Sequence, residues 1–371
     1  MYKTSKISDI TRFGKGKETL VVDMGGSAVK AGLFQDGKMI EKGLWRHDYK
    51  NSCFAAARSD LLSKLKEICS GRADLVGLGI AGLLSCDGTL FRSTVLTSFT
   101  GSNIGQFVAK KFGAESYTQD NDADCGAIGE HYYIGTELFY VVIGSGIGSA
   151  CVDSGGKLLY PVRIDRNIPF VEEMNHPISD IGLRSAISRQ EIADTFVKMG
   201  IMDHGLSMDA ESIQLGSLGS AVGVGNILQM LWKGKFFGED CKKYYMKYLE
   251  ENDGMLQDLF SERYAARTMA KLAKNGEPRS MLAYRLMGRF LGKAISRAEK
   301  ILYEDHGRYF QVRLAGNILD SRELFWPDMA SEIEENGVQA ECVLSEAYSR
   351  GVNPNMLGAY LRVNREAKFY G

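Results

Sequence analysis

The stretch Asp23-Met24-Gly25-Gly26-Ser27-Ala28-Val29-Lys30 follows the apolar run Leu20-Val21-Val22 and decides the fold. The pattern predicts a strand, a glycine-hydroxyl turn and a second strand, with the hairpin closed at Asp36-Gly37-Lys38. Glycines in such a turn let the backbone approach a ligand, and consecutive N–H groups form a concavity that binds anions. We therefore expect a phosphate-binding turn that uses Gly25, Gly26 and Ser27.

The same pattern is written a second time, about a third of the chain later. Val141-Val142-Ile143 leads into Gly144-Ser145-Gly146-Ile147-Gly148, and a second strand pattern follows. Neither turn continues into a helix with Lys-Ser/Thr, which excludes a P-loop, and the strand after the second turn excludes a Rossmann arrangement. Two such turns across a cleft could hold one polyphosphate from both sides, with the second contributing Gly144, Ser145, Gly146 and Gly148.

Composition limits the partners and the compartment. The 371 residues favour two domains, and the net charge of -1 provides no global field for nucleic acid or a membrane surface. Seven scattered cysteines without a CxxC pair indicate reduced thiols in a cytoplasmic protein. The polar N-terminal stretch lacks the apolar run of a secretory signal, and no apolar run is long enough to span a membrane.

Strand and helix patterns alternate in the first half, and the second half is largely helical. We expect strands at 20–23, 29–34, 38–44, 75–80, 116–119 and 312–315, and helices over 54–68, 105–112, 123–132 and 280–303. Ser188 to Glu191 fits a capping box, and Asn353-Pro354 opens a last helix. Residues 201–280 show only weak organisation.

Charged residues of the first turn allow two interpretations. Asp23 could hold Mg²⁺ through water while Lys30 serves as a charge partner of the phosphates. Alternatively, the segment is an ordinary glycine-rich turn with a solvent-exposed lysine. The second, similar turn favours the functional interpretation.

A second carboxylate, Asp122, lies where a strand ends and a helix begins. It could be a general base for a substrate hydroxyl, and its acidic neighbours Asp120 and Asp124 would raise its proton affinity if they shared a site. It could equally be a helix N-cap carboxylate. The residues alone leave these alternatives open.

Two weaker signals occur in the second half. Glu173 and His176 form a polar cluster that could grip vicinal hydroxyls, although a solvated surface loop explains the same residues. Gly316-Asn317, after a short strand, could let a nucleoside lie flat on the backbone, or could be a simple strand-ending turn.

The order of these motifs resembles the ROK family of sugar kinases, within the hexokinase–actin–Hsp70 ATPase superfamily. The resemblance rests on both turns and on four further segments: 79–82, 121–124 with Gly129-Glu130, 173–176 and 315–317. It implies an α/β, two-domain actin-like ATPase (ribonuclease H-like) fold with mixed sheets flanked by helices and an active-site cleft between domains. The domains would span 1–125 and 126–353, and a final helix, about 354–368, would pack back on the first.

The resemblance also implies a chemistry: Mg²⁺-assisted transfer of the ATP γ-phosphoryl to a hydroxyl of a hexose or N-acetylhexosamine. Asp122 would take the hydroxyl proton, and Asn121, Glu173 and His176 would match the family's sugar contacts. A homodimer is the default oligomer.

The chain also departs from the family pattern. The family commonly follows its Glu-x-x-His with zinc-binding cysteines, whereas no cysteine occurs here between Cys151 and Cys241, so no zinc is predicted. This difference keeps a second hypothesis open, a sugar-binding or regulatory protein that retains the fold without turnover. A third, an ATPase that acts on a protein partner through an iron–sulfur cluster, has no support from the cysteine spacing.

Overall fold

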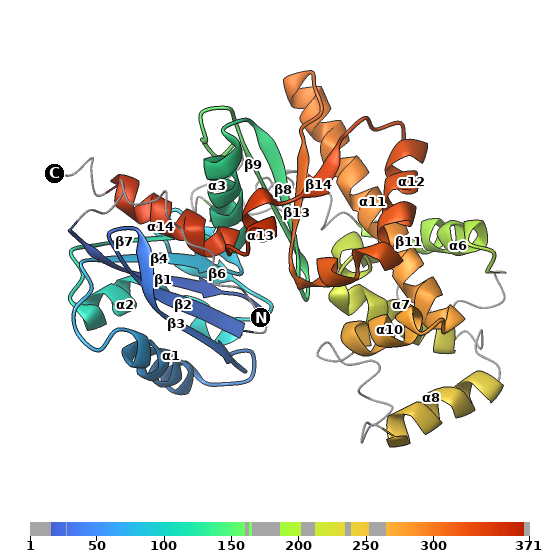
Figure 1. The fold of residues 1–371 in the computed structure, drawn as a ribbon, viewed down its shortest axis with the longest axis horizontal. Coiled ribbons are helices and arrows are strands. Elements are labelled where there is room, and N and C mark those ends of the chain that lie inside the picture. Colours follow the sequence, from blue (N-terminus) through green and yellow to red (C-terminus); the bar gives the residue numbers. More distant parts are fainter. Residues whose placement is uncertain are drawn as a thin grey trace.

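A computed structural model describes residues 16–26, 28–159, 163–164, 186–201, 212–233, 239–251 and 265–366. These residues form two lobes, each built on a mixed sheet with helices packed against it (Figure 1). The fold class expected from the sequence is therefore confirmed. None of the described helices is both long and apolar enough to cross a membrane.

The first lobe is built on a five-stranded sheet in the order β3-β2-β1-β4-β7. Its strands are β1 (Glu18–Met24), β2 (Ala28–Gln35), β3 (Lys38–Arg46), β4 (Leu75–Ile80) and β7 (Ser116–Asn121). β1, β2 and β3 form an antiparallel meander, and β4 and β7 add in parallel to β1. The carboxyl ends of β1, β4 and β7 therefore meet at one edge of the sheet.

The second lobe repeats most of this plan in the order β9-β8-β13-β14. Its strands are β8 (Leu138–Ile143), β9 (Ile147–Val152), β13 (Val312–Ala315) and β14 (Cys342–Leu344). β8 and β9 form an antiparallel hairpin, and β13 and β14 add in parallel to β8. Both predicted hairpins are thus confirmed, and each begins a sheet of the same strand order.

Helices cover both faces of the first sheet. α1 (Phe54–Ile68) and α2 (Ile104–Phe112) pack on the face that carries Leu20 and Val22, whereas α3 (Asp122–Ile134) and α14 (Pro354–Glu366) cover the face of Val21. This alternation follows from the two-residue period of a strand whose faces are both buried. α3 also packs on β9, so it connects the two sheets (Figure 1).

Glycines allow α3 and α14 to pack closely. A Cβ atom at Gly129 would lie 2.1 Å from the carbonyl oxygen of Pro354, and one at Gly358 would lie 1.7 Å from that of Cys125. Real side chains cannot approach so closely, so glycine is required at both positions. The last helix, the farthest in sequence, is thereby fixed against the middle of the first lobe.

The second lobe carries most of the remaining helices. These are α6 (Arg189–Lys198), α7 (Ala221–Lys233), α8 (Glu239–Glu251), α10 (Ala265–Lys274), α11 (Pro278–His306), α12 (Trp326–Glu335) and α13 (Glu346–Ser349). α6 begins with the expected capping box of Ser188 and Glu191. Three helices, α7, α8 and α10, lie in the region 201–280, where the sequence showed only weak organisation.

Short elements complete the described chain. β5 (Leu83–Ser85), β6 (Leu90–Arg92) and β10 (Arg163–Ile164) form a small sheet, and β11 (Ala186–Ser188) pairs with β12 (Ser212–Gln214). Single 3₁₀ segments occur at η2 (Thr97–Phe99), η3 (Leu215–Ser217) and η4 (Asn317–Leu324).

Candidate active site

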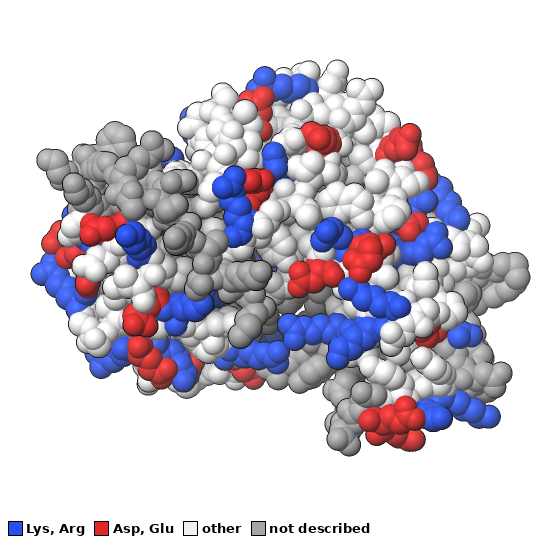
Figure 2. All heavy atoms as spheres, viewed as in Figure 1, with Lys and Arg blue, Asp and Glu red and all other residues white. Residues whose placement is uncertain are grey.

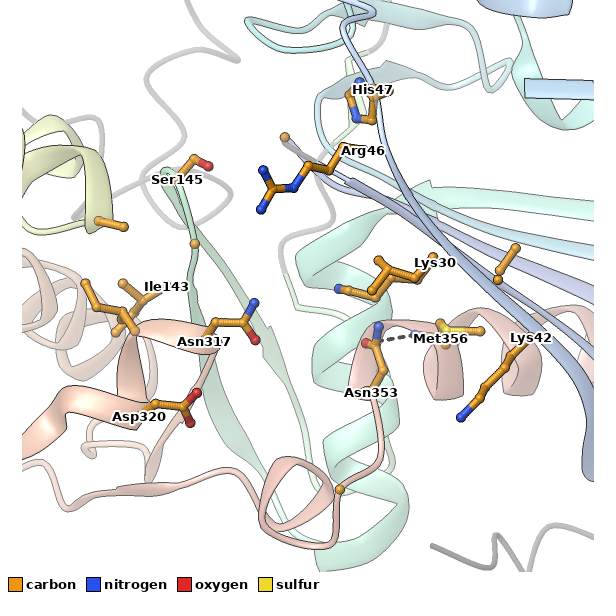
Figure 3. Close-up of a pocket in the computed structure, with 18 of the residues that line it drawn as sticks. Lys30, Lys42, Arg46, His47, Ile143, Ser145, Asn317, Asp320, Asn353 and Met356 are labelled. Atoms are coloured by element: carbon orange, nitrogen blue, oxygen red, sulfur yellow. Dashed lines mark hydrogen bonds between the residues drawn. The ribbon is translucent and has the colours of Figure 1, made fainter. Parts of the chain in front are cut away.

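A cleft of about 1690 Å³ lies between the lobes and is lined by both glycine turns. Gly26 and Lys30 line it from the first hairpin, Gly144 and Ser145 from the second, and Asn317 from η4 (Figure 3). The structure therefore brings together residues that lie almost 300 positions apart in the sequence. Eight of its lining residues are lysine or arginine, against three that are aspartate or glutamate, which suits an anionic ligand.

Asp23 lies at the end of β1 and is almost completely buried. Its register partner on β2 is Lys30, whose Nζ lies 2.8 Å from Oδ2 of Asp23. The solvent-exposed lysine of the alternative interpretation is therefore wrong, because Lys30 is paired and only partly exposed. Its charge is engaged by Asp23 and does not simply face the cleft.

Two carboxamides that sequence analysis missed also hold Asp23. Asn353 donates from Nδ2 to Oδ2 of Asp23 at 2.8 Å, and Asn355 donates from Nδ2 to Oδ1 at 3.3 Å. Both lie at the start of α14, more than 300 residues from Asp23. The Asn353-Pro354 pair was visible only as the start of a helix, and nothing local to it indicated a contact with the first turn.

Asp122 is the first residue of α3, directly after β7. The parallel register of β1, β4 and β7 places it at the sheet edge where Asp23 ends β1. β4 carries Gly79 there, and a Cβ at that glycine would lie 3.5 Å from Cα of Asp122. Burial, reinforced by the negative charge of Asp23, raises the pKa of Asp122 to about 7. A carboxylate with this pKa can exchange a proton near neutral pH.

The alternative role of Asp122 as a helix cap is wrong. The cap of α3 is Asn121, whose Oδ1 accepts from the backbone N–H groups of Ala123 and Asp124. Asn121 also donates from Nδ2 to the carbonyl of Gly82 at 2.9 Å. These bonds fix the start of the helix; Asp122 follows the cap as the first helical residue, and its Oδ1 also accepts from the N–H of Ala123 at 3.0 Å.

The acidic neighbours of Asp122 do not act as expected. Asp120 pairs with Arg362 of α14, at 3.1 Å between Oδ2 and Nε, and Asp124 is buried within α3. The carboxylate whose charge raises the pKa of Asp122 is instead Asp23, about a hundred positions earlier. Sequence proximity identified the wrong partner because β1 and β7 meet only in the folded sheet.

The second turn is fixed by the start of α7. The carbonyl of Gly144 accepts from the N–H of Ala221 at 3.1 Å, and the carbonyl of Ser145 accepts from the hydroxyl of Ser220 at 3.0 Å. Within the turn, the N–H of Gly144 donates to the carbonyl of Gly146 at 2.8 Å. Among the described residues, apart from the two chain neighbours of Gly146, no atom lies within 4 Å of a Cβ built at this glycine, so it leaves open space beside the backbone. Such space fits a bound phosphate chain.

Gly316 places the next segment against this turn. Its φ is 117°, a region that favours glycine, and a Cβ there would lie 2.0 Å from the carbonyl oxygen of Ile143. Gly316 therefore ends β13 in a turn, which was one of the two interpretations of this segment. Its close approach to Ile143 also brings Asn317 to the cleft wall (Figure 3).

His47 is a further residue that sequence analysis did not single out. Its Nε2 lies 2.9 Å from the carbonyl oxygen of Gly25, and its ring stacks on Tyr49 with centroids 4.2 Å apart. Burial lowers the pKa of His47, which favours the neutral imidazole. A neutral ring that donates to Gly25 fixes the first turn without adding charge.

Three predicted contacts, Ser27, Glu173 and His176, lie outside the described residues. Among the residues that the structure does describe, no group of three or more His, Cys, Asp or Glu side chains could hold a metal ion. This composition still fits Mg²⁺, which is usually bound through one or two carboxylates, substrate phosphates and water. Asp23 fits such a role, since a cation beside it would offset the repulsion between it and Asp122.

The related sheets and the cleft between them define a two-lobed α/β protein with an actin-like fold. Comparison of the sequence with family models and with curated proteins gives no match. Solved structures do match: a ROK family glucokinase from Streptomyces griseus, in complex with glucose and AMPPNP, has a TM-score of 0.64 at 16% identity, covering 94% of this chain and 99% of that one.

Two further structures show how widely this fold is used. A ROK hexokinase from Thermus thermophilus has a TM-score of 0.57 at 15% identity and covers 94% of this chain and 99% of its own. A ROK family transcriptional regulator, a homolog of the E. coli MLC protein, has a TM-score of 0.60 at 13% identity. That match covers 95% of this chain and 79% of the regulator. The chain thus has the fold of the ROK family, as the motif order predicted. Because that fold includes kinases and a regulator, function must be argued from the site.

Proposed function

We propose that this protein is an ATP-dependent kinase that transfers the γ-phosphoryl group to a hydroxyl of a hexose or an N-acetylhexosamine. The observation that carries the proposal is the position of Asp122, beside Asp23 at the sheet edge where the first glycine turn begins. A nucleophilic hydroxyl needs a proton acceptor next to the phosphoryl donor, and a donor held at the first turn would lie on the side of Asp122.

Asp122 would act as the general base. Its pKa of about 7 means that near neutral pH a large fraction is ionised and still basic enough to accept the hydroxyl proton. A positioned base contributes about 10²- to 10⁴-fold to such a step. Asn121, which orients the first turn of α3, would keep this carboxylate in place and contact the sugar.

The two turns would hold the donor. Backbone N–H groups at Gly26 in the first turn and at Ser145 and Gly146 in the second would bind phosphate oxygens from opposite lobes, and Asn317 would lie beside the nucleoside. The N–H groups of Gly25 and Gly144 already donate within their own turns. Asp23 would hold Mg²⁺ through water, and that ion supplies charge neutralisation for the transferred phosphoryl group. Closure of the cleft would exclude water, which otherwise competes with the sugar hydroxyl for the phosphoryl group.

A coupled ADP-release assay over a panel of hexoses and N-acetylhexosamines tests this proposal. We expect sugar-dependent ADP release by the wild type and a kcat lower by about 10²- to 10⁴-fold in Asp122→Asn, with unchanged AMPPNP binding. Asp124→Asn makes the same chemical change two residues later on α3 and is the matched control. An Asp122→Asn variant that turns over as fast as wild type would refute the assignment.

The second candidate is a sugar-binding or regulatory protein without turnover. One observation favours it: Asp23 already accepts hydrogen bonds from Lys30, Asn353 and Asn355, which occupy most of its capacity for a metal-bound water. Calorimetric binding of a sugar by a wild-type protein that releases no ADP with any sugar would support this candidate.

A further inference from the structure

The first hairpin lacks a free cation of its own for the phosphates. Lys30 was the expected partner, yet its Nζ lies 2.8 Å from Oδ2 of the buried Asp23. An ammonium that is paired in this way offers a phosphate much less attraction than a free one. A nucleotide bound at this turn therefore calls for a positive charge from another residue.

The register of the sheet brings such a residue, Arg46, to the turn. β2 and β3 pair so that Arg46, the last residue of β3, lies directly opposite Ala28, the first residue of β2 after the turn. Directly paired residues have Cβ atoms about 5 Å apart and point to the same face of a sheet. Arg46 is therefore part of the first turn in space, although it follows the turn by about twenty positions.

The next residue fixes Arg46 against the turn. His47 contacts the carbonyl of Gly25 at 2.9 Å through Nε2 and stacks on Tyr49, whose hydroxyl donates to Asp60 at 2.8 Å. The backbone that carries Arg46 is thus held at both sides, by the β2 ladder and by the His47 ring. The main chain at Arg46 is therefore already ordered, and ligand binding would cost little further conformational entropy there.

The side chain of Arg46 extends from this anchored backbone into the cleft. Figure 3 shows its guanidinium group directed across the cleft toward Ser145 of the second turn. Arg46 is exposed, and its side chain makes no hydrogen bond or ion pair within the described part of the chain. Lys42 of the same strand also lines the cleft without a partner among these residues, but it points away from Ser145 (Figure 3).

We propose that Arg46 is the residue of the first lobe that binds the phosphate chain of the donor and links it to the second turn; this rests on the proposed use of a nucleotide. A guanidinium group presents a planar fork of N–H donors that matches two phosphate oxygens and stays charged at every physiological pH. A phosphate chain between Arg46 and the Gly144–Gly146 backbone would touch both lobes. The same contact would favour closure of the cleft.

Calorimetric titration with adenosine, AMP, ADP and AMPPNP in the presence of Mg²⁺ tests this role. Arg46→Ala should weaken AMPPNP binding by roughly ten- to a hundredfold, the usual effect of losing a charged hydrogen bond. The loss should shrink as phosphates are removed and vanish for adenosine, a dependence that a merely structural role would not produce. Arg46→Lys should recover only part of the affinity, since an ammonium lacks the fork.

Lys42→Ala is the matched control, because Lys42 is a free cation on the same strand that points elsewhere. It should leave AMPPNP affinity within about twofold of wild type, because Lys42 points away from Ser145 and the second turn although it lines the same cleft. Equal affinities of the Arg46→Ala and Lys42→Ala variants for AMPPNP would overturn the inference. So would a loss for Arg46→Ala that is as large for adenosine as for AMPPNP.

The outcome can be separated from that of the kinase proposal. A protein that binds AMPPNP with this dependence on Arg46 but releases no ADP with any sugar would refute the kinase function and support the inference. A protein that turns over normally after Arg46→Ala, with an unchanged KM for ATP, would refute the inference alone. A wild type that binds none of the four ligands would overturn it as well.

Discussion

The hairpins β1–β2 and β8–β9 have the same place in their sheets, but the first carries charged side chains and the second does not. The first carries Asp23 and Lys30 in a buried ion pair, supported by carboxamides from α14. The second has no charged side chain between Ile143 and Val152, and its turn is fixed by backbone and hydroxyl bonds to the start of α7. One scaffold therefore carries a charged hairpin in the first lobe and an uncharged hairpin in the second.

This difference suits a reaction in which one ligand is held from both sides. Asp23 and Asp122, the carboxylates proposed to hold a metal-bound water and to accept a proton, both lie in the first lobe. A neutral turn in the second lobe can approach a phosphate chain without repelling it. Figure 2 shows lysine and arginine side chains gathered where the two lobes meet on that face, consistent with the basic lining of the cleft.

A single side chain connects the two hairpins. Asn355 donates to Oδ1 of Asp23 in β1 and accepts from the hydroxyl of Tyr140 in β8, at 3.3 and 3.2 Å. The charged hairpin β1–β2 is thus coupled to the uncharged hairpin β8–β9 through the start of α14. Changes that remove the contrast between the hairpins should therefore affect both activity and stability.

The largest effect is expected from Asp23→Asn, which removes the charge of the first hairpin. Lys30 loses its partner, and the free energy of unfolding should fall by about 2–3 kcal/mol, less than for a fully buried pair because Lys30 reaches solvent. Loss of the carboxylate beside the reacting groups should lower kcat by at least about a hundredfold. Urea unfolding and ADP release measure the two effects.

Asp120→Asn provides the control, because Asp120 is equally buried and paired with Arg362, away from the cleft. It should reduce stability while ADP release continues near the wild-type rate. Similar losses of kcat in both variants would show that the effect of Asp23 is structural.

The next effect is on the pH profile. Because the pKa of Asp122 is raised to about 7 and the ionised form is the base, kcat/KM should fall about tenfold for each pH unit below that value and level off above it. The Asp122→Asn variant should have a low kcat/KM that does not fall further as the pH is lowered. A wild-type profile that stays flat from about pH 5 to 8 would contradict the assigned role.

The smallest effects come from two glycines that differ in their surroundings. Gly146→Ala places a methyl group in open space, so the free energy of unfolding should stay within about 0.5 kcal/mol while AMPPNP binding weakens. Gly129→Ala forces a methyl group onto the carbonyl of Pro354, and stability should fall by about 1–3 kcal/mol. Thermal denaturation measures the stability of both variants, and calorimetry measures their affinity for AMPPNP. A Gly146→Ala variant that loses stability but keeps its AMPPNP affinity would contradict this expectation.

Much of the fold could be predicted because its signals are local. Alternating apolar residues and glycine turns defined both hairpins, and Ser188 with Glu191 defined a capping box that the structure reproduces. α7, α8 and α10 were missed. Apolar residues lie on most sides of α7, and Val224, Ile227 and Leu228 are all buried. The sequence of α7 therefore lacks the one-sided apolar pattern that predicts a surface helix.

The candidate site was harder to predict, because its geometry depends on pairing between distant segments. Asn353 and Asn355 reach Asp23 only after α14 packs on the first lobe. Arg46 could not be placed from the sequence, although a three-strand meander was expected, because a regular register from the Asp36-Gly37 turn pairs Ala28 with Trp45. A β-bulge between Leu33 and Phe34 shifts the pairing by one residue and brings Arg46 opposite Ala28.

The most direct test of the account is a crystal structure of the protein with AMPPNP and Mg²⁺. We predict a phosphate chain bound by backbone N–H groups of both turns, at Gly26 and at Ser145–Gly146, with its terminal phosphate on the side of Asp122. A nucleotide held by only one turn, or bound away from the cleft between the lobes, would contradict the central claim.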